Sequence, residues 1–156
     1  MNVKTDILND SSAAWTPDAA SCNEWIASAL SGADYSQQCS VSVRYVDESE
    51  SQTLNASFRG KDTPTNVLSF PANLPADVIK RLGNEFLGDI VICAPILEKE
   101  ARQQGKTLAA HWAHLTVHGT LHLLGFDHET EADAEIMENL EISSLHNLGF
   151  DNPYQN

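Results

Sequence analysis

The chain has 156 residues, 42% of them hydrophobic, and a formal net charge of −13 at pH 7. This length suits one domain with its own core, and this charge argues against a protein whose whole surface holds nucleic acid. No apolar run approaches the roughly 18 residues of a membrane span, so we expect a single domain over residues 1–156 that does not cross a membrane.

The first part of the chain alternates short strands with short helices. A strand is expected over residues 2–8, and the next helix should begin with Thr16 as its N-cap, Pro17 as its first residue and Asp18 near its positive end. That helix should run to about Gly32. The pattern then predicts a strand over 39–46, a helix over 47–58 and a strand over 65–70 that Pro71 stops.

The second part of the chain is mainly helical. We expect a loop over 71–85, a near-continuous apolar strand over 85–93, and a helix from Pro95 through Gln104 that Gly105 ends. A histidine-bearing helix and an acidic helix, approximately 129–148, complete the chain. Strands first and helices last predict an α+β fold: a small mixed sheet of about four strands covered by about five helices.

Two further features bear on the compartment of the protein. The N-terminal segment "MNVKTDILND" has neither the basic start nor the apolar stretch of a signal peptide, which predicts a cytoplasmic protein. The cysteines are odd in number and widely spaced, and each lies in a helix or strand pattern, so we expect buried free thiols at Cys22, Cys39 and Cys93.

Charge is distributed unevenly along the chain. All nine lysines and arginines lie between Lys4 and Lys106, whereas residues 107–156 hold eight acidic residues and all six histidines. The acidic C-terminal helix is interpreted first as a solvated surface. The two parts of the chain are therefore expected to do different work.

The stretch "HGTLHLLGFDH", residues 118–128, carries the strongest chemical signal. Its spacing, H-x-x-x-H-x-x-G-x-x-H, matches a metzincin protease zinc motif, except that Gly119 stands where those proteases have their glutamate. At 100° per residue, His111, His114, His118 and His122 share a stripe about 80° wide on one helix. A buried helix with this stripe is expected to face a specific site.

Helix geometry selects the metal ligands. His118 and His122 are one turn apart, roughly 6 Å, so both can reach one ion, whereas His114 lies about 12 Å from His122. Gly125 can turn the chain back so that His128 approaches the same ion. Three neutral imidazoles with an open fourth position predict one catalytic zinc ion per chain.

Gly119 itself has two interpretations. Without the glutamate, the site is not built for peptide cleavage by the usual route. Alternatively, a residue without a side chain lets another element pack closely against a buried helix. Structural roles are expected for the histidines outside the ligand set, His111, His114 and His146, with His114 close enough to support a ligand.

Several separated motifs together resemble one family. "HGTLHLLGFDH", preceded by "HWAHLTV", "LNASFRGKDTPTNVLSFP" and "LGDIVICA", is similar to the YbeY family of bacterial endoribonucleases, from about Val41 to the closing "NPY". The first 38 or so residues and the loop over 72–84 match weakly. The resemblance implies zinc held by His118, His122 and His128, maturation of the 16S ribosomal RNA 3′ end, and quality control of 70S ribosomes.

The same resemblance points to Arg59 as a catalytic residue beside His118. In "SFRGKD", Arg59-Gly60-Lys61 forms a short basic loop at a helix end, where a glycine allows close approach and an arginine can hold phosphate with two N–H groups. Asn66 is expected to cap or position this loop.

Three hypotheses follow for the function. The first is a zinc-dependent, single-strand-specific endoribonuclease that acts on precursor ribosomal RNA presented by the small ribosomal subunit and its proteins, with either water or the RNA 2′-hydroxyl attacking. The second is a metallopeptidase or other hydrolase with Asp89 or Asp127 as its base. The third is a non-catalytic, metal-stabilised ribosome-assembly factor that binds partners through the helix over 129–148.

Overall fold

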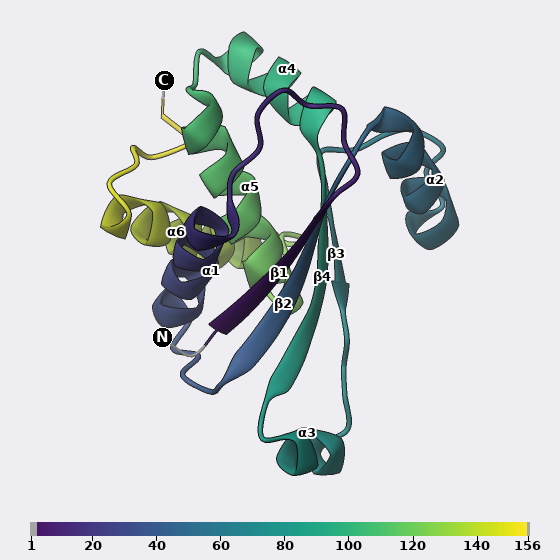
Figure 1. The fold of residues 1–156 in the computed structure, drawn as a ribbon. Helices are drawn as coiled ribbons and strands as arrows, with labels where there is room; N and C mark the ends of the chain where they lie inside the picture. The colour runs from purple at the N-terminus through teal and green to yellow at the C-terminus, as the bar shows by residue number, and fades with distance from the viewer. Residues whose placement is uncertain (1–2, 156) are drawn as a thin grey trace.

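A four-stranded mixed sheet lies at the centre of the structure, a computed structural model that describes residues 3–155 (Figure 1). The strand order is β1-β2-β4-β3; β1, β2 and β4 are parallel, and β3 runs antiparallel to β4. The strands are β1 (Val3–Asn9), β2 (Cys39–Val46), β3 (Val67–Pro71) and β4 (Glu85–Cys93). The α+β class and the four strands are as predicted, although residue 2, where the first strand was expected to begin, lies outside the described residues.

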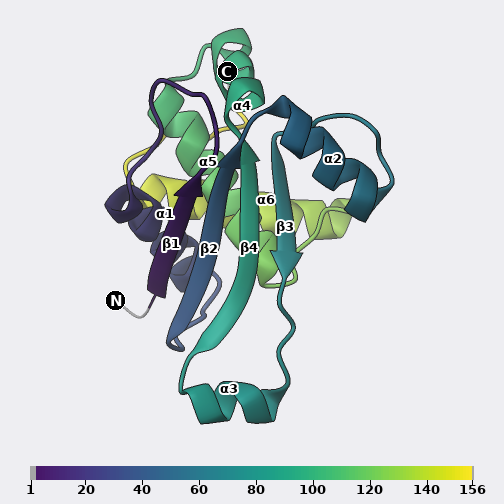
Figure 2. The same ribbon diagram turned by 45° about the vertical axis from the view of Figure 1, so that its right-hand side comes forward.

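The helices divide between the two faces of the sheet (Figures 1 and 2). One face is covered by α1 (Ala19–Gly32), α5 (Leu108–Leu123) and α6 (Glu131–Asn147). Alternate residues of β2 and β4, among them Val43 and Ile90, join them in the main core. On the other face, α2 (Glu48–Arg59) contributes to a smaller apolar cluster around Val91, whereas α4 (Ala94–Gln104) contacts this cluster through Ile96 and the main core through Leu97.

Two details of the predicted helices were wrong. The first helix begins at Ala19 with Asp18 as its N-cap, because the Asp18 carboxylate accepts the backbone N–H of Ser21, whereas the Pro17 carbonyl accepts the Tyr45 hydroxyl outside the helix. The expected loop over 71–85 contains a helix, α3 (Ala76–Leu82). Its apolar residues Val78, Ile79 and Leu82 lie at helical spacing, but none of them is buried.

Burial of the cysteines is confirmed. Cys22, Cys39 and Cys93 are all buried and free. None of the described helices is long and apolar enough to cross a membrane.

Gly119 marks the point where α5 packs most tightly on the sheet. A Cβ atom at this position would lie 2.9 Å from Cγ2 of Ile90 and 3.3 Å from Oγ of Ser69. The Ser69 hydroxyl also donates to the Gly119 carbonyl oxygen, at 2.9 Å. The glycine is therefore a close-packing residue, and the missing glutamate of the metzincin pattern has no space here.

Gly119→Ala is expected to destabilise the protein by about 1–3 kcal/mol, because the β-branched Ile90 cannot move aside easily. Chemical denaturation would measure this change. As a control on the same helix, the exposed Ala109→Gly should also destabilise, by about 1 kcal/mol through helix propensity alone. Equal or greater stability of Gly119→Ala would contradict the packing argument.

Candidate metal centre

Helix α5, which carries four of the histidines, is buried around most of its circumference. Its N-cap Thr107 accepts the backbone N–H of Ala110. In the middle of the helix, the buried hydroxyls of Thr116 and Thr120 donate to carbonyl oxygens one turn back, each at 2.8 Å. The helix can therefore pass through the core without leaving these hydroxyls unpaired.

The chain reverses directly after α5 and carries His128 back toward the helix. Gly125 has φ 99°, which favours glycine. The N–H of Phe126 donates to the carbonyl of Leu121 at 3.1 Å, and that of Gly125 to the carbonyl of His122 at 3.0 Å. These two bonds form a Schellman motif, which fixes the direction of the chain leaving the helix.

Three histidines converge as the spacing predicted. One ring nitrogen from each of His118, His122 and His128 lies within 4.8 Å of the others, so the group could hold a metal ion. The Nε2 atoms of His118 and His122 are 3.1 Å apart. Two nitrogens bound to one tetrahedral zinc ion at about 2.0–2.1 Å would be about 3.3 Å apart, so the donor set fits zinc.

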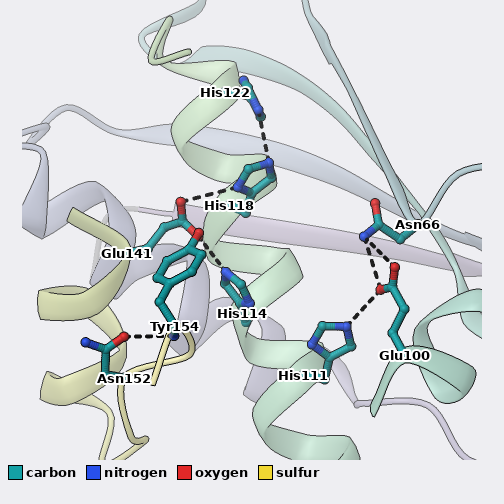
Figure 3. Close-up of polar contacts among 9 residues, drawn as sticks. All are labelled: Asn66, Glu100, His111, His114, His118, His122, Glu141, Asn152 and Tyr154. Atoms are coloured by element: carbon teal, nitrogen blue, oxygen red, sulfur yellow. Dashed lines mark hydrogen bonds and ion pairs between the residues drawn. The ribbon is translucent and has the colours of Figure 1, made fainter. Parts of the chain in front are cut away.

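A buried glutamate from another helix supports this group (Figure 3). Glu141 of α6 is 1% exposed, and its Oε2 atom lies 3.3 Å from Nδ1 of His118. Its Oε1 atom accepts the Tyr154 hydroxyl at 2.8 Å and contacts Nε2 of His114 at 2.5 Å. When Nδ1 of His118 donates to this carboxylate, Nε2 keeps its lone pair for a metal.

Glu141 was not predicted as part of the site. The acidic helix was interpreted as solvated, but Glu141 lies one turn from both Met137 and Leu145, which are buried. That spacing is the signal that could have identified it, because an acid between two core positions of a helix needs a buried partner.

The charge states in this cluster suit metal binding. Burial, and after it the neighbouring His118 and His128, lower the pKa of His122 to about 4, so its imidazole is neutral at pH 7. Burial alone would raise the pKa of Glu141, but hydrogen bonds from His114 and His118 bring it down to about 2. His122 is therefore a neutral nitrogen ligand, and the Glu141 carboxylate that contacts His118 is ionised. Both charge states favour metal binding.

Glu141→Gln is expected to weaken zinc binding by about 10–100-fold, the usual effect of removing a carboxylate behind a histidine ligand. Competition against a chromogenic chelator at fixed pH would measure the affinity. Glu135→Gln, an exposed change on the same helix, should leave it unaltered. If both variants bind zinc as the unchanged protein does, Glu141 has no role in holding the metal.

The three histidines line a cavity of about 430 Å³ together with Arg59 and Lys61. Arg59 is the last residue of α2, and Gly60 follows it in the left-handed conformation, at φ 70°. The Arg59 side chain is exposed and makes no hydrogen bond or ion pair with the other described residues. An uncommitted guanidinium therefore lies beside the histidine cluster.

The loop that follows Arg59 is tied back to α2. The buried Asn55 side chain donates to the Thr63 carbonyl at 2.8 Å, and the Ser51 hydroxyl donates to the Thr65 carbonyl at 2.7 Å. Asn66 was expected to cap or position this loop. Instead, it accepts the backbone N–H of Val67 at the start of β3 and donates to Glu100 of α4.

The two predicted candidate bases, Asp127 and Asp89, lie in different places relative to the cavity. Asp127 lines the cavity, where its Oδ1 atom accepts the backbone N–H of His128 at 2.7 Å. Asp89 does not line it, because its neighbour Ile90 faces Gly119 and adjacent strand residues point to opposite faces. Asp89 was therefore wrong as a candidate base for this site.

The histidines outside the ligand set also differ from one another. His111 is buried and contacts Oε1 of Glu100 at 2.9 Å, and His114 is held by Glu141. His146 is exposed and contacts neither of these glutamates. Structural roles for the first two agree with these contacts.

Comparison with known proteins gives consistent matches over most of the chain. A family model described as "Endoribonuclease YbeY" matches residues 7–149, so the likeness begins well before Val41, where the distinctive motifs start. Proteins named Endoribonuclease YbeY from Xanthomonas axonopodis pv. citri (strain 306) and Stenotrophomonas maltophilia (strain K279a) are 55% and 52% identical over 138 residues. Each match covers 88% of this chain and 84% of the relative.

A solved structure shows a similar fold. The solution structure of TM1509 from Thermotoga maritima aligns with a TM-score of 0.55 and 24% sequence identity. The alignment covers 98% of this chain and 100% of that one.

Proposed function

The chain belongs to the YbeY family of endoribonucleases, and from this premise we propose that it is a zinc-dependent, single-strand-specific endoribonuclease that matures ribosomal RNA. One observation carries the proposal most directly: three histidines that could hold a metal and an uncommitted arginine line the same cavity. A phosphodiester in this cavity would lie beside the arginine and beside a metal ion held by the histidines.

Some residues of the site would hold the metal, and another would bind the phosphate. His118, His122 and His128 would hold one zinc ion, which when bound polarises a phosphoryl oxygen and acidifies a water molecule. Arg59 would donate two N–H groups to the phosphate oxygens and stabilise the charge that grows on them during cleavage. Asp127 would fix the loop that bears His128 through the backbone hydrogen bond.

The two other hypotheses have less support. A peptidase would need a base, and Gly119 leaves no space for the usual glutamate, so Asp127 is the remaining one of the two proposed carboxylates. A purely structural metal site would have no use for the free Arg59 side chain beside it. The side of α6 that bears the buried Glu141 faces inward and contacts His118, so this side is not open to a partner.

A cleavage assay tests this function directly. The zinc-loaded protein should cut unstructured RNA, spare a stable RNA duplex and a single-stranded DNA of the same sequence, and lose activity with a chelator. A chelated protein that stays folded but inactive supports an enzyme, whereas unfolding on chelation with no turnover beforehand supports the assembly-factor hypothesis.

The proposed substrate is precursor ribosomal RNA at the 16S 3′ end, presented by the small ribosomal subunit, with a further role in 70S ribosome quality control in the cytoplasm. The charge of −13 supports presentation by a partner, because the protein body repels free RNA. We expect the same RNA segment to be cut faster within small-subunit particles than free, at equal concentration and salt. Equal rates would contradict presentation by a partner.

A further inference from the structure

A second cavity, of about 550 Å³, adjoins the metal centre. Asn66, Val67 and His118 line both this cavity and the one that holds Arg59, so the two cavities are neighbours that share these residues as a wall. The outer wall of the second cavity is formed by Pro153 and Tyr154, near the C-terminus. Neither the metal nor the phosphate contacts proposed above use this space.

The Tyr154 ring is held in place while remaining 47% exposed. Its hydroxyl donates to the buried Glu141 at 2.8 Å, and its backbone N–H donates to the Asn152 side chain at 2.8 Å (Figure 3). The His114 ring packs nearly perpendicular to it, with centroids 5.4 Å apart. A fixed, partly exposed aromatic ring is a common stacking surface for unpaired bases, because little conformational entropy is lost on binding.

A carboxylate lines the same cavity. Glu100 accepts Nε2–H of His111 at 2.9 Å, and the Asn66 amide donates to both carboxylate oxygens at 3.1 and 3.2 Å (Figure 3). These contacts use both acceptor sites of Oε1 but one of the two sites of Oε2. Burial would raise the pKa of Glu100, but the bonds from His111 and Asn66 lower it below the usual value, so the group is ionised.

The polar groups of this wall fit a nucleobase edge, because Glu100 is an acceptor and Lys106, which lines the same cavity, is a donor. An ionised carboxylate repels a phosphate group but accepts an N–H from a nucleobase edge. The exposed Gln103 and Gln104 side chains at the rim form no hydrogen bond with the described residues, so their amides are free to contact polar atoms of a ligand. The cavity thus combines a stacking surface with a polar edge.

We propose that this second cavity binds one unpaired nucleobase of the RNA, stacked on Tyr154 and donating an amino N–H to Glu100. The inference rests on the proposed function, because the phosphate beside Arg59 and the base would belong to one strand. Cytosine, adenine and guanine carry such an amino group. Uracil would be disfavoured, since the carbonyl oxygens on both sides of its ring N–H would face the carboxylate.

Cytosine and uracil form the matched test, because their rings have the same size. Binding of labelled oligocytidine and oligouridine to the zinc-loaded protein would be measured by fluorescence anisotropy in the cold, with RNA integrity checked on a gel. Oligocytidine should bind roughly tenfold more tightly, the usual worth of a hydrogen bond to a charged group. Glu100→Gln should bring the two affinities together, since an amide both donates and accepts, whereas Glu98→Gln should not.

Two substitutions at Tyr154 separate stacking from support of the metal. Tyr154→Phe removes the hydroxyl bond to Glu141 but keeps the ring, so it should retain binding of both oligonucleotides. Tyr154→Leu should weaken both roughly tenfold through lost stacking. The zinc content of both variants, measured in parallel, shows whether any effect passes through Glu141.

The outcomes distinguish this inference from the proposed function. If the protein cuts RNA but binds both oligonucleotides equally, or Tyr154→Leu and Glu100→Gln change nothing, the base site is wrong and the nuclease stands. If it discriminates between the oligonucleotides without cutting any RNA, the base site stands and the nuclease is wrong. A protein that binds neither oligonucleotide overturns the base site, and cleavage of RNA within small-subunit particles then decides on the nuclease.

Discussion

Replacing His118 with alanine is expected to remove most of the bound zinc and to abolish RNA cleavage. His118 contributes Nε2 beside His122 and is the histidine of the group that contacts the buried Glu141, so its loss removes both a ligand and the connection to α6. His122→Ala and His128→Ala should have the same effect on metal content. Elemental analysis after dialysis gives the zinc content, and RNA cleavage is measured on the same samples.

Two other histidines serve as controls for this prediction. His146→Ala should match the unchanged protein in both measurements, because the side chain is exposed and does not line the cavity of the histidine cluster. His114→Ala should retain zinc with lower affinity, because it contacts Glu141 but lies too far along α5 to bind the same ion. Full zinc content in all three ligand variants would show that the metal is held elsewhere.

Arg59→Ala is expected to reduce cleavage by about 10²–10³-fold, the typical cost of losing one group that stabilises transition-state charge. Zinc content and thermal stability should be unchanged, because the side chain makes no hydrogen bond or ion pair with the described residues. The measurement is the single-turnover cleavage rate at saturating protein, which excludes a simple effect on binding.

Graded substitutions sharpen this second prediction. Arg59→Lys keeps the charge but loses the paired N–H groups, so it should fall between arginine and alanine. Lys61→Ala, in the same loop and cavity, should cost less than Arg59→Ala. A normal cleavage rate in Arg59→Ala would rule out the proposed role of the basic loop.

The fold could be predicted wherever buried residues recur at a regular spacing in the sequence. The alternation of Val41, Val43 and Tyr45 marks β2, because one face of that strand enters the core. The helix α3 was missed, although Lys80 and Arg81 lie in its last turn and Gly83 ends it, because seven residues are too few for a periodic pattern to stand out. The start of α1 was displaced because Thr16 and Asp18 are both good N-caps, and the contact between Tyr45 and Pro17 is not visible in the sequence.

The candidate site likewise has residues that local sequence patterns predict and residues that come from distant parts of the chain. The positions of His118, His122 and His128 follow from helix periodicity and one glycine turn, because all three lie within 11 consecutive residues. Glu141 enters from another helix, 23 positions from His118, and no local rule connects the two. The role proposed for Arg59 came from family resemblance, because a single arginine before a turn is by itself a weak signal.

The contact between Gly119 and the sheet also bears on how such sites could diverge. A single codon change could place a glutamate beside His118 and complete the metzincin pattern, but the side chain would meet Ile90 and Ser69 of the sheet. The helix and the sheet would first have to separate. The substitution would therefore lower the stability of the protein, and selection for stability would oppose this route to a peptidase.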